Sequence, residues 1–340
     1  MNLFAAVVLA AISNPAGAPA SIQHARIEVR SGTIPAAALA EAARDRDESW
    51  VGWSVPAIPK PVEMCCLDDR FKASGCSLAE GNDSWGTSDQ DVHPGASQFF
   101  VLVQTREGAP RRIRVLSPTC PVEGADRRVT WLGAVEPAAS LDALEPLLDA
   151  RRDEVADTAL AAVAHHADAR ADAILERRAL DRAASREARQ QAMFWAANAR
   201  GPSGYRMVER ILSTDPSGDV REHAIFALTQ SELPEAPERI RRASVEDRDP
   251  DVRAQALFWL AQTHADGAGR WILSRLDADR DPHVREQAVF ALSQLEDGTD
   301  WLLDLVRSDR GAETKKRALF WLGQSDDPRA LQEIEKILAR

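Results

Sequence analysis

The 340-residue sequence lacks several features that would place it in large functional classes. It has no run of about 20 apolar residues, the length that a helix needs to span a bilayer, so we expect no transmembrane span in the mature chain. It has 42 basic side chains against 53 acidic ones, a formal net charge of -11. Nucleic-acid binding through a broad basic surface is therefore excluded, because phosphate contacts need clustered lysine and arginine.

Catalytic motifs are also missing. No G-x-S-x-G elbow, phosphate-binding loop or glycine-rich dinucleotide fingerprint occurs. We therefore predict that the protein is not an enzyme, with no catalytic, cofactor-binding or metal-binding residues and no cofactor. The 44% hydrophobic and 28% charged content is near the globular average, which excludes wholesale disorder. The length suits about two domains.

Residues 1–20 predict a cleaved signal peptide. The apolar stretch 3–12 is too short to span a bilayer, but it suits the central region of a secretory signal. Ala18-Pro19-Ala20 then forms a cleavage site before Ser21. No lysine or arginine precedes the apolar stretch, and a short buried N-terminal segment is the alternative. We predict a bacterial protein of the periplasm or the secreted space, cleaved near Ala20.

Cysteine is scarce, and all four cysteines lie in the first 120 residues: Cys65, Cys66, Cys76 and Cys120. An even number clustered in one part of an exported protein is typical of disulfides. Adjacent cysteines rarely bridge each other, so we expect one of Cys65 and Cys66 to pair with Cys76 and the other with Cys120. Zinc is the alternative, but the spacing lacks the paired C-x2-4-C knuckles of structural zinc sites.

Residues 21–136 predict a small β-rich domain. Three runs, 99–104, 112–116 and 129–135, resemble strands, and the turn-rich connection between the first two predicts a hairpin. The polar stretch 68–97 predicts a long surface loop. We expect disulfides to staple this domain because its core is modest.

Residues 137–340 are dominated by an internal repeat. The segments AMFW, AIFA, ALFW, AVFA and ALFW begin with alanines spaced 32, 32, 32 and 30 residues apart. A fixed period in this range indicates stacked helical hairpins, and a weaker copy at 159–163 brings the number to about six. Each repeat shares a phenylalanine, a base before the segment and an amide after it. These columns are Phe194, Phe226, Phe258, Phe290, Phe320; Arg189, Arg221, Arg253, Arg285, Lys315; and Asn198, Gln230, Gln262, Gln294, Gln324.

The helix boundaries of one repeat can be predicted from its sequence. Asp249-Pro250 and Asp281-Pro282 each place a capping aspartate before a proline in the first turn. The units DPDVRAQALFWLAQ and DPHVREQAVFALSQ resemble the bacterial HEAT-like repeats of the phycobilisome-lyase class, over residues 153–340. The resemblance implies a mainly α chain whose right-handed, armadillo-like α-solenoid of about six HEAT-like hairpins follows the small β-rich domain. It implies no particular function, because one fold hosts many roles.

The metal site known in one relative of this repeat class does not carry over. That relative is an iron-dependent hydroxylase, which holds its metal with His-Glu pairs. None of the seven histidines here precedes a glutamate: His24, His93, His165, His166, His223, His264 and His283. Adjacent His165 and His166 would point about 100° apart on a helix, which disfavours a shared metal.

Three columns of the repeat could be structural or could bind a partner. Trp195, Trp259 and Trp321 alternate with alanines, which favours core packing with the phenylalanines over a ligand groove. We expect the amides to be buried and to form a hydrogen-bonded ladder rather than a recognition surface. We expect the basic column to pair with aspartates near the N-cap of the next repeat.

Together these features predict a non-enzymatic protein-protein interaction scaffold of the bacterial cell envelope or the secreted space. Its partner would be another protein, bound on the solenoid surface. Two alternatives stay open. One is a HEAT-like lyase or metal-dependent oxidoreductase, which needs a convergent set of histidines and carboxylates. The other is an extracytoplasmic sensor whose β-rich domain binds a small ligand.

Overall fold

A computed structural model describes residues 15–59, 62–68, 72, 74–79, 84–88 and 97–338. The chain forms two compact units, Met1–Arg177 and Arg178–Arg340. Most of the expected signal peptide, up to residue 14, lies outside the described residues. Among the helices that the structure describes, none is both long and apolar enough to cross a bilayer.

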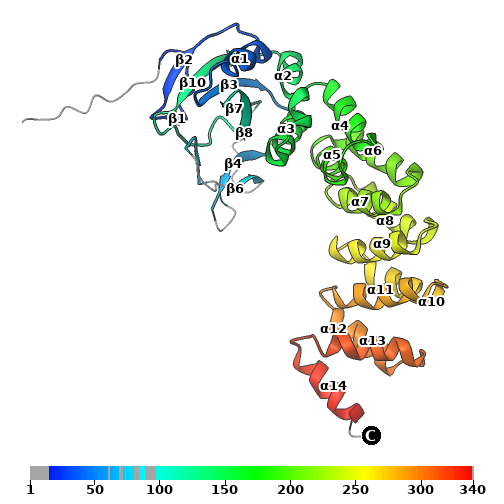
Figure 1. Cartoon of the computed structure of the whole chain (residues 1–340). Helices are drawn as coiled ribbons and strands as arrows, with labels where there is room; N and C mark the ends of the chain where they lie inside the picture. The colour runs from blue at the N-terminus through cyan, green and yellow to red at the C-terminus, as the bar shows by residue number, and fades with distance from the viewer. Residues whose placement is uncertain are drawn as a thin grey trace, which may run out of the picture. The chain divides into compact units, whose positions relative to one another are not determined.

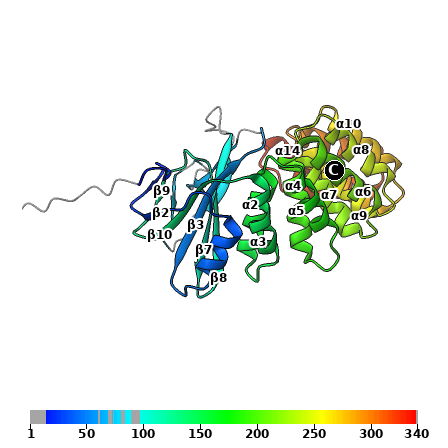
Figure 2. The same ribbon diagram turned by 90° about the horizontal axis from the view of Figure 1, so that it is seen from above.

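The first unit is built on a five-stranded mixed sheet with the strand order β2-β10-β3-β7-β8 (Figure 2). Strand β10 runs parallel to both β2 and β3, whereas β3, β7 and β8 are antiparallel to one another. The strands are β2 (Arg26–Val29), β10 (Arg128–Ala134), β3 (Ser49–Pro56), β7 (Gln98–Arg106) and β8 (Ala109–Leu116). The central strands are apolar on both sides because both faces of the sheet are covered.

Successive side chains of β3 point into different layers. Trp50 belongs to a core cluster that includes all four cysteines, together with Leu102 and Trp131. Trp53 points to the opposite face, where helices α1 (Pro35–Ala42), α2 (Pro137–Leu144) and α3 (Asp153–His165) pack. Between them, Gly52 allows close packing, since a Cβ there would lie 2.9 Å from the ring of Trp131.

The three expected strands are confirmed as parts of β7, β8 and β10. The hairpin between β7 and β8 is also present, but its turn is tighter than expected. Glu107 and Gly108 have φ values of 56° and 80°, the left-handed conformation that two-residue hairpin turns of type I′ require.

Short strands interrupt the region expected to be one long loop, 68–97. Strand β6 (Ser84–Ser88) pairs with β4 (Glu63–Leu67), and β5 (Cys76–Ser77) pairs with β9 (Val122–Glu123), which also pairs with β1 (Ile22–Gln23). The loop prediction is therefore wrong for these segments, and the other residues of 68–97 fall largely outside the described part. Within β6, Trp85 donates a hydrogen bond to the carbonyl of Val115 at 2.6 Å, a contact that the polar composition does not reveal.

The boundary between the units lies later than the expected 136/137. Helix α3 packs on β8, and His166 at its end contacts the ring of Phe99 in β7 at 5.1 Å between centroids. The first, weak repeat at 159–163 is therefore covered by the sheet and belongs to the first unit. Helices α2 and α3, with the 3-10 turn η1 (Glu145–Asp149) between them, form a layer on the sheet.

The second unit is a stack of five helical hairpins that follows α4 (Arg170–Leu180), which crosses the boundary (Figure 1). The first helix of each hairpin packs on the first helix of the next. We call these five the stripe helices: α5 (Arg186–Ala199), α7 (Gly218–Thr229), α9 (Pro250–Gln262), α11 (Pro282–Ser293) and α13 (Ala312–Leu322). Their partners are α6 (Gly201–Thr214), α8 (Glu235–Glu246), α10 (Ala268–Ala278), α12 (Gly298–Arg307) and α14 (Pro328–Leu338).

The predicted helix boundaries of the repeat are confirmed. The side chains of Asp249 and Asp281 accept hydrogen bonds from backbone N–H groups of the first turns of α9 and α11. Gly267, the N-cap of α10, has a φ of 72°, so the break between the two helices falls at a residue without a Cβ.

Candidate functional site

The basic column of the repeats forms an ion-pair ladder. Arg189, Arg221 and Arg253 each bind the aspartate 26 residues later, with N–O distances of 3.0, 2.9 and 2.9 Å. These aspartates lie two residues before the N-cap of the next stripe helix, close to the position expected from the sequence. The 26-residue spacing ends at Arg285, because the last repeat is two residues shorter and has its aspartate at Asp309. Arg285 donates to the carbonyls of Asp279 and Arg280.

The ladder is structural rather than a binding surface. Burial raises the pKa of Asp247, but hydrogen bonds from Arg221 and from the backbone of Asp249 outweigh burial and hold that pKa below its ordinary value. The Arg221 and Asp247 side chains are only 3% and 8% exposed. Their charges are satisfied by each other.

The aromatic columns form one continuous row of rings across the five stripe helices. Phe226 contacts Trp259 of the next repeat at 4.9 Å between centroids, and Phe290 contacts Trp321 at 4.6 Å. Phe258 and Phe290 stack at 5.7 Å between centroids. At one end of the row Phe194 contacts Trp195 and Phe226, and at the other end Phe320 contacts Trp321. We call this row the aromatic stripe: Phe194, Trp195, Phe226, Phe258, Trp259, Phe290, Phe320 and Trp321.

Core packing explains only part of the stripe. Trp195 is buried, and Ala227 and Ala291 are fully buried, which fits the expected alternation of large and small side chains. The phenylalanines of the first four repeats are half-buried, as are Trp259 and Trp321. Phe320 is 56% exposed. The stripe therefore presents an extended, partly open aromatic surface.

The amide column lies beside the stripe, and the expectation of a buried ladder is wrong. Gln262, Gln294 and Gln324 are exposed, and Gln230 is half-buried. The amides of Gln230 and Gln294 donate to the hydroxyls of the residues just before them, not to neighbouring repeats. The reason is positional: the stripe helices end at this column, so its side chains reach solvent.

A cavity of about 360 Å³ opens between α7, α8 and α9 at the junction of these two columns. Trp259, Gln230 and Gln262 line it, with Leu228 and Ile240 supplying apolar wall. The indole N–H of Trp259 is buried and finds no hydrogen-bond acceptor in the part of the chain that the structure describes. The cavity thus combines an apolar wall with side-chain amides that can both donate and accept hydrogen bonds.

Acidic side chains border both ends of the stripe helices. The first turn of four of these helices carries an exposed carboxylate: Glu187, Asp219, Asp251 and Glu313. The loops that follow the helices carry a second exposed set: Glu232, Asp266, Glu296 and Asp326. We call these two sets the acidic borders. They were not singled out from the sequence, because acidic residues are frequent throughout this chain.

Glu222 shows how strongly negative the middle of this surface is. It lies one turn before Phe226 on α7. Burial raises the pKa of its carboxyl group, and the neighbouring charges of Asp219, Asp251 and Asp249 raise it further. A cation placed beside these groups would therefore be stabilised.

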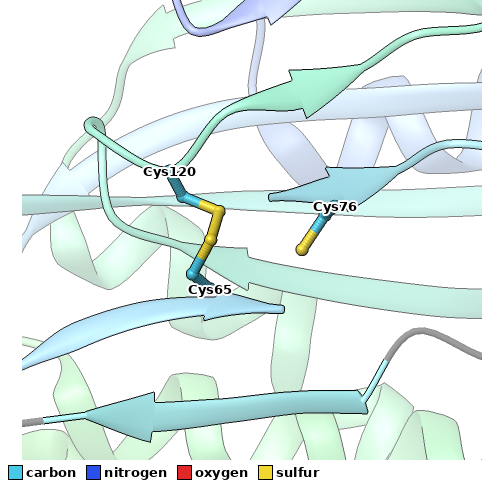
Figure 3. A group of neighbouring side chains, drawn as sticks. All are labelled: Cys65, Cys76 and Cys120. Atoms are coloured by element: carbon cyan, nitrogen blue, oxygen red, sulfur yellow. A yellow bond between two sulfur atoms is a disulfide. The ribbon is translucent and has the colours of Figure 1, made fainter. Parts of the chain in front are cut away.

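The four cysteines form two disulfides, Cys65–Cys120 and Cys66–Cys76. This pairing is one of the two left open by the sequence. Figure 3 shows the Cys65–Cys120 disulfide with the side chain of Cys76 beside it, and the three sulfurs lie within 4.8 Å of one another. Among the described residues, these three cysteines are the one group of histidine, cysteine and carboxylate side chains with ligand atoms this close together, but all three sulfurs are bonded in disulfides and offer no thiolate to a metal ion.

The adjacent histidines do not converge on a common point. His165 and His166 are buried, and each contacts a different backbone carbonyl through Nδ1, that of Ala161 and that of Ala162. His166 also contacts the hydroxyl of Ser140 at 2.8 Å, an arrangement that resembles a catalytic dyad. Ser140 is fully buried, however, and its oxygen accepts the indole N–H of Trp53, so it ties α2 and α3 to the sheet.

Comparisons with known proteins agree with the repeat architecture. A family model of HEAT repeats matches residues 205–293 and 240–309, so this region consists of HEAT repeats. No curated protein matches the chain. A solved structure of the Escherichia coli protein YibA is 18% identical, with a TM-score of 0.34, and the match covers 48% of this chain and 62% of YibA.

Two further structures have the same kind of similarity. The complex of CpcE and CpcF of phycocyanin lyase from Nostoc is 16% identical with a TM-score of 0.30, covering 56% of this chain and 76% of that one. Human deoxyhypusine hydroxylase is 16% identical with a TM-score of 0.29, covering 55% and 73%. At these identities the similarity concerns the fold alone.

Proposed function

We propose that this protein is a non-enzymatic interaction scaffold of the bacterial cell envelope or the secreted space, which binds another protein through the aromatic stripe. The observation that carries the proposal is a continuous row of eight aromatic rings, all of which except Trp195 are partly or largely exposed. Extended apolar surface of this kind is costly to leave in water, and it marks binding sites on soluble proteins. Helical repeat stacks use such extended surfaces for recognition.

An oxidising location is supported by the two disulfides. Disulfides form and persist in exported proteins and are rare in the reducing cytosol. The measurement is a thiol titration of denatured, unreduced protein from its native host, combined with sequencing of the mature N-terminus. We expect no free thiols and a start near Ser21. Four free thiols would move the protein to a reducing compartment and remove the envelope from the proposal.

The binding surface is tested by matched variants on two faces of the second unit. Phe320→Ser removes an exposed ring of the stripe, whereas Val245→Ser removes an exposed apolar side chain of α8 outside it. Both residues are largely exposed, so both variants should keep the fold. We expect cross-linking in envelope extracts to capture one discrete partner with the wild type and with Val245→Ser, but not with Phe320→Ser. Equal capture by all three proteins would exclude the stripe.

A second function, a sensor for a small ligand, is favoured by one feature of the first unit. A cavity of about 620 Å³ lies beside α1, β2 and β10. It is lined by three arginines and three carboxylates, among which Arg30 pairs with Glu28 and Glu41, and Arg128 with Asp45. Mixed charges in a cavity of this size suit a polar or zwitterionic ligand. Ligand-dependent hydrogen-exchange protection of α1 and β2 is the test.

The lyase or oxidoreductase alternative is tested by metal analysis of the purified protein.

A further inference from the structure

We infer that the partner segment held by the aromatic stripe is an extended peptide with arginine or lysine at every third position. This inference rests on the proposed function and specifies the chemistry of the same site. It is carried by three features that meet on the stripe helices: the acidic borders, the spacing of the repeats and the exposed amides.

Charge selects a cationic occupant. On the three central stripe helices, α7, α9 and α11, the acidic side chains outside the ladder are Asp219, Glu222, Asp251 and Glu286. The arginines of these helices are held in the ladder or against backbone carbonyls. The acidic border in the following loops adds Glu232, Asp266 and Glu296. Arg186 of α5 and Arg317 of α13 pair with Asp219 and Glu286. Even with these two arginines counted, acidic side chains outnumber basic ones on both rims, and the row of partly open rings runs between them.

Aromatic rings and carboxylates bind the same kind of side chain. The faces of phenylalanine and tryptophan attract an arginine guanidinium or a lysine ammonium, and the rims supply opposite charge. The chain uses this chemistry elsewhere, since Arg241 and Arg275 lie over the ring of Trp271 at 6.0 and 5.7 Å. The cavity beside Trp259 can seat the aliphatic stem of such a side chain.

The repeat spacing sets the spacing of the ligand. Packed helices lie about 8–10 Å apart, and an extended chain advances about 3.3 Å per residue. Three residues of an extended peptide therefore span one repeat, so basic side chains at every third position reach equivalent sites. The exposed amides of Gln262, Gln294 and Gln324 recur with the same period and can bond the peptide backbone.

The test uses the full mature chain and synthetic twelve-residue peptides, with binding followed by fluorescence anisotropy. The first peptide has arginine at positions 1, 4, 7 and 10 in an alanine and proline background. The second has glutamate at those positions, and the third has four arginines in adjacent positions. We expect the first peptide to bind, the second not to bind, and the third to bind about tenfold more weakly, because its side chains cannot reach successive repeats.

Two variants with equal charge change locate the site. Glu222→Gln/Asp251→Asn neutralises two acids on the stripe helices, and Glu246→Gln/Asp304→Asn neutralises two exposed acids on α8 and α12. We expect the first pair to weaken the spaced peptide about tenfold and the second pair to leave it unchanged. Equal loss in both variants, or equal binding of all arginine peptides, would reduce the effect to general charge attraction and overturn the inference.

The outcomes separate this inference from the proposed function. Capture of a partner that is lost in Phe320→Ser, without binding of the spaced peptide, would leave the scaffold standing and refute the basic peptide. Capture that is insensitive to Phe320→Ser would refute the use of the stripe itself. Self-association of the chain that is abolished by Phe320→Ser, seen by sedimentation, would make a second copy the occupant and would also overturn the inference.

Discussion

Arg221 binds both carboxylate oxygens of Asp247, 26 residues later in the chain, through Nε and Nη2 at 2.9 Å each. The same arginine donates through Nη1 to the backbone carbonyls of Asp215 and Pro216 at the start of its own repeat. One side chain thus fixes the loops before two successive stripe helices. Arg253 repeats the arrangement one step along the stack, with Asp279 and the carbonyl of Asp247.

Removing one partner of this pair should destabilise the protein strongly. Asp247→Ala leaves the Arg221 guanidinium buried without its carboxylate, and we expect a loss of about 3–5 kcal/mol in the free energy of unfolding. The double variant Arg221→Met/Asp247→Leu should recover most of that loss, since it leaves no buried charge. Urea denaturation of the three proteins measures both effects.

The surface pair Arg186–Asp219 is the matched control for this ladder. Its side chains are 58% and 65% exposed, so Asp219→Ala should cost about 0–1 kcal/mol. A similar cost for Asp219→Ala and Asp247→Ala would show that burial does not set the strength of the ladder.

The ladder could be predicted from the sequence, but the exposure of the columns could not. In the sequence, a basic residue recurs once per repeat and is followed by an aspartate near the N-cap of the next repeat. This regular spacing is enough to predict that the two side chains form an ion pair. A helix that is apolar around most of its circumference is expected to be buried between its neighbours. The phenylalanines, however, lie at the edge of the contact between neighbouring stripe helices, and most of them are only half-buried. For Gln230 and Gln294 the decisive fact is that each is the C-cap of its helix. Periodicity does not fix helix ends to one residue.

In the β-rich region, a different feature limits what the sequence can predict. Strand β3, with the sequence SWVGWSVP, is buried along almost its whole length. The alternation that identifies a half-exposed strand is therefore absent from it. Its position between β10 and β7 depends on parallel pairing with a segment nearly 80 residues away, which local patterns do not encode. The hairpin of β7 and β8 is local, and it was predicted.

His223 should make the stability of the second unit depend on pH. Burial lowers its pKa below 6.5, and the nearby Arg186 lowers it further, although a contact with the carbonyl of Gln190 at 3.2 Å opposes the shift. Below pH 6.5 the unfolded chain therefore binds this proton more readily than the native one. Stability is fully present above that pH and falls as the pH drops toward the native pKa.

The measurement is the urea midpoint between pH 7.5 and pH 5. We expect the midpoint to fall over this range in the wild type and to fall less in His223→Gln. Identical slopes in the wild type and His223→Gln would show that this histidine is not the group responsible.

Ser140 should be a structural rather than a catalytic serine. Its hydroxyl accepts the indole N–H of Trp53 and lies 2.8 Å from Nε2 of His166. Because Nδ1 of His166 faces a carbonyl and must carry the proton, Nε2 is the acceptor of the Ser140 hydroxyl. Ser140→Ala removes both contacts, and we expect a loss of about 1–3 kcal/mol in the free energy of unfolding.

Ser274 offers the comparison for Ser140. It is exposed on α10, where its hydroxyl donates to the carbonyl of Trp271 one turn earlier and accepts from Nε of the neighbouring Arg275 at 3.3 Å, so among the described residues it joins no other element. Ser274→Ala should therefore leave the unfolding free energy within about 0.5 kcal/mol of the wild type. If Ser140→Ala is equally neutral in urea denaturation, the hydroxyl does not join α2 and α3 to the sheet.

Loss of Cys66 alone should rearrange the remaining disulfide. In Cys66→Ser the Cys76 thiol is freed within 4.8 Å of the Cys65 and Cys120 sulfurs, close enough to attack either of them by thiol–disulfide exchange. We expect peptide mapping after acid quenching to find Cys76 bonded to Cys65 or Cys120 in part of the population.

The double variant Cys66→Ser/Cys76→Ser removes the attacking thiol and should retain Cys65–Cys120 alone. Because that bond closes a loop of 55 residues against 10 for Cys66–Cys76, chain entropy assigns it about 4 kcal/mol, and the shorter loop about 3 kcal/mol. Cys65→Ser/Cys120→Ser should then unfold at a lower urea concentration than Cys66→Ser/Cys76→Ser. The reverse order would mean that local packing around Cys76, rather than loop length, sets the contribution of each disulfide.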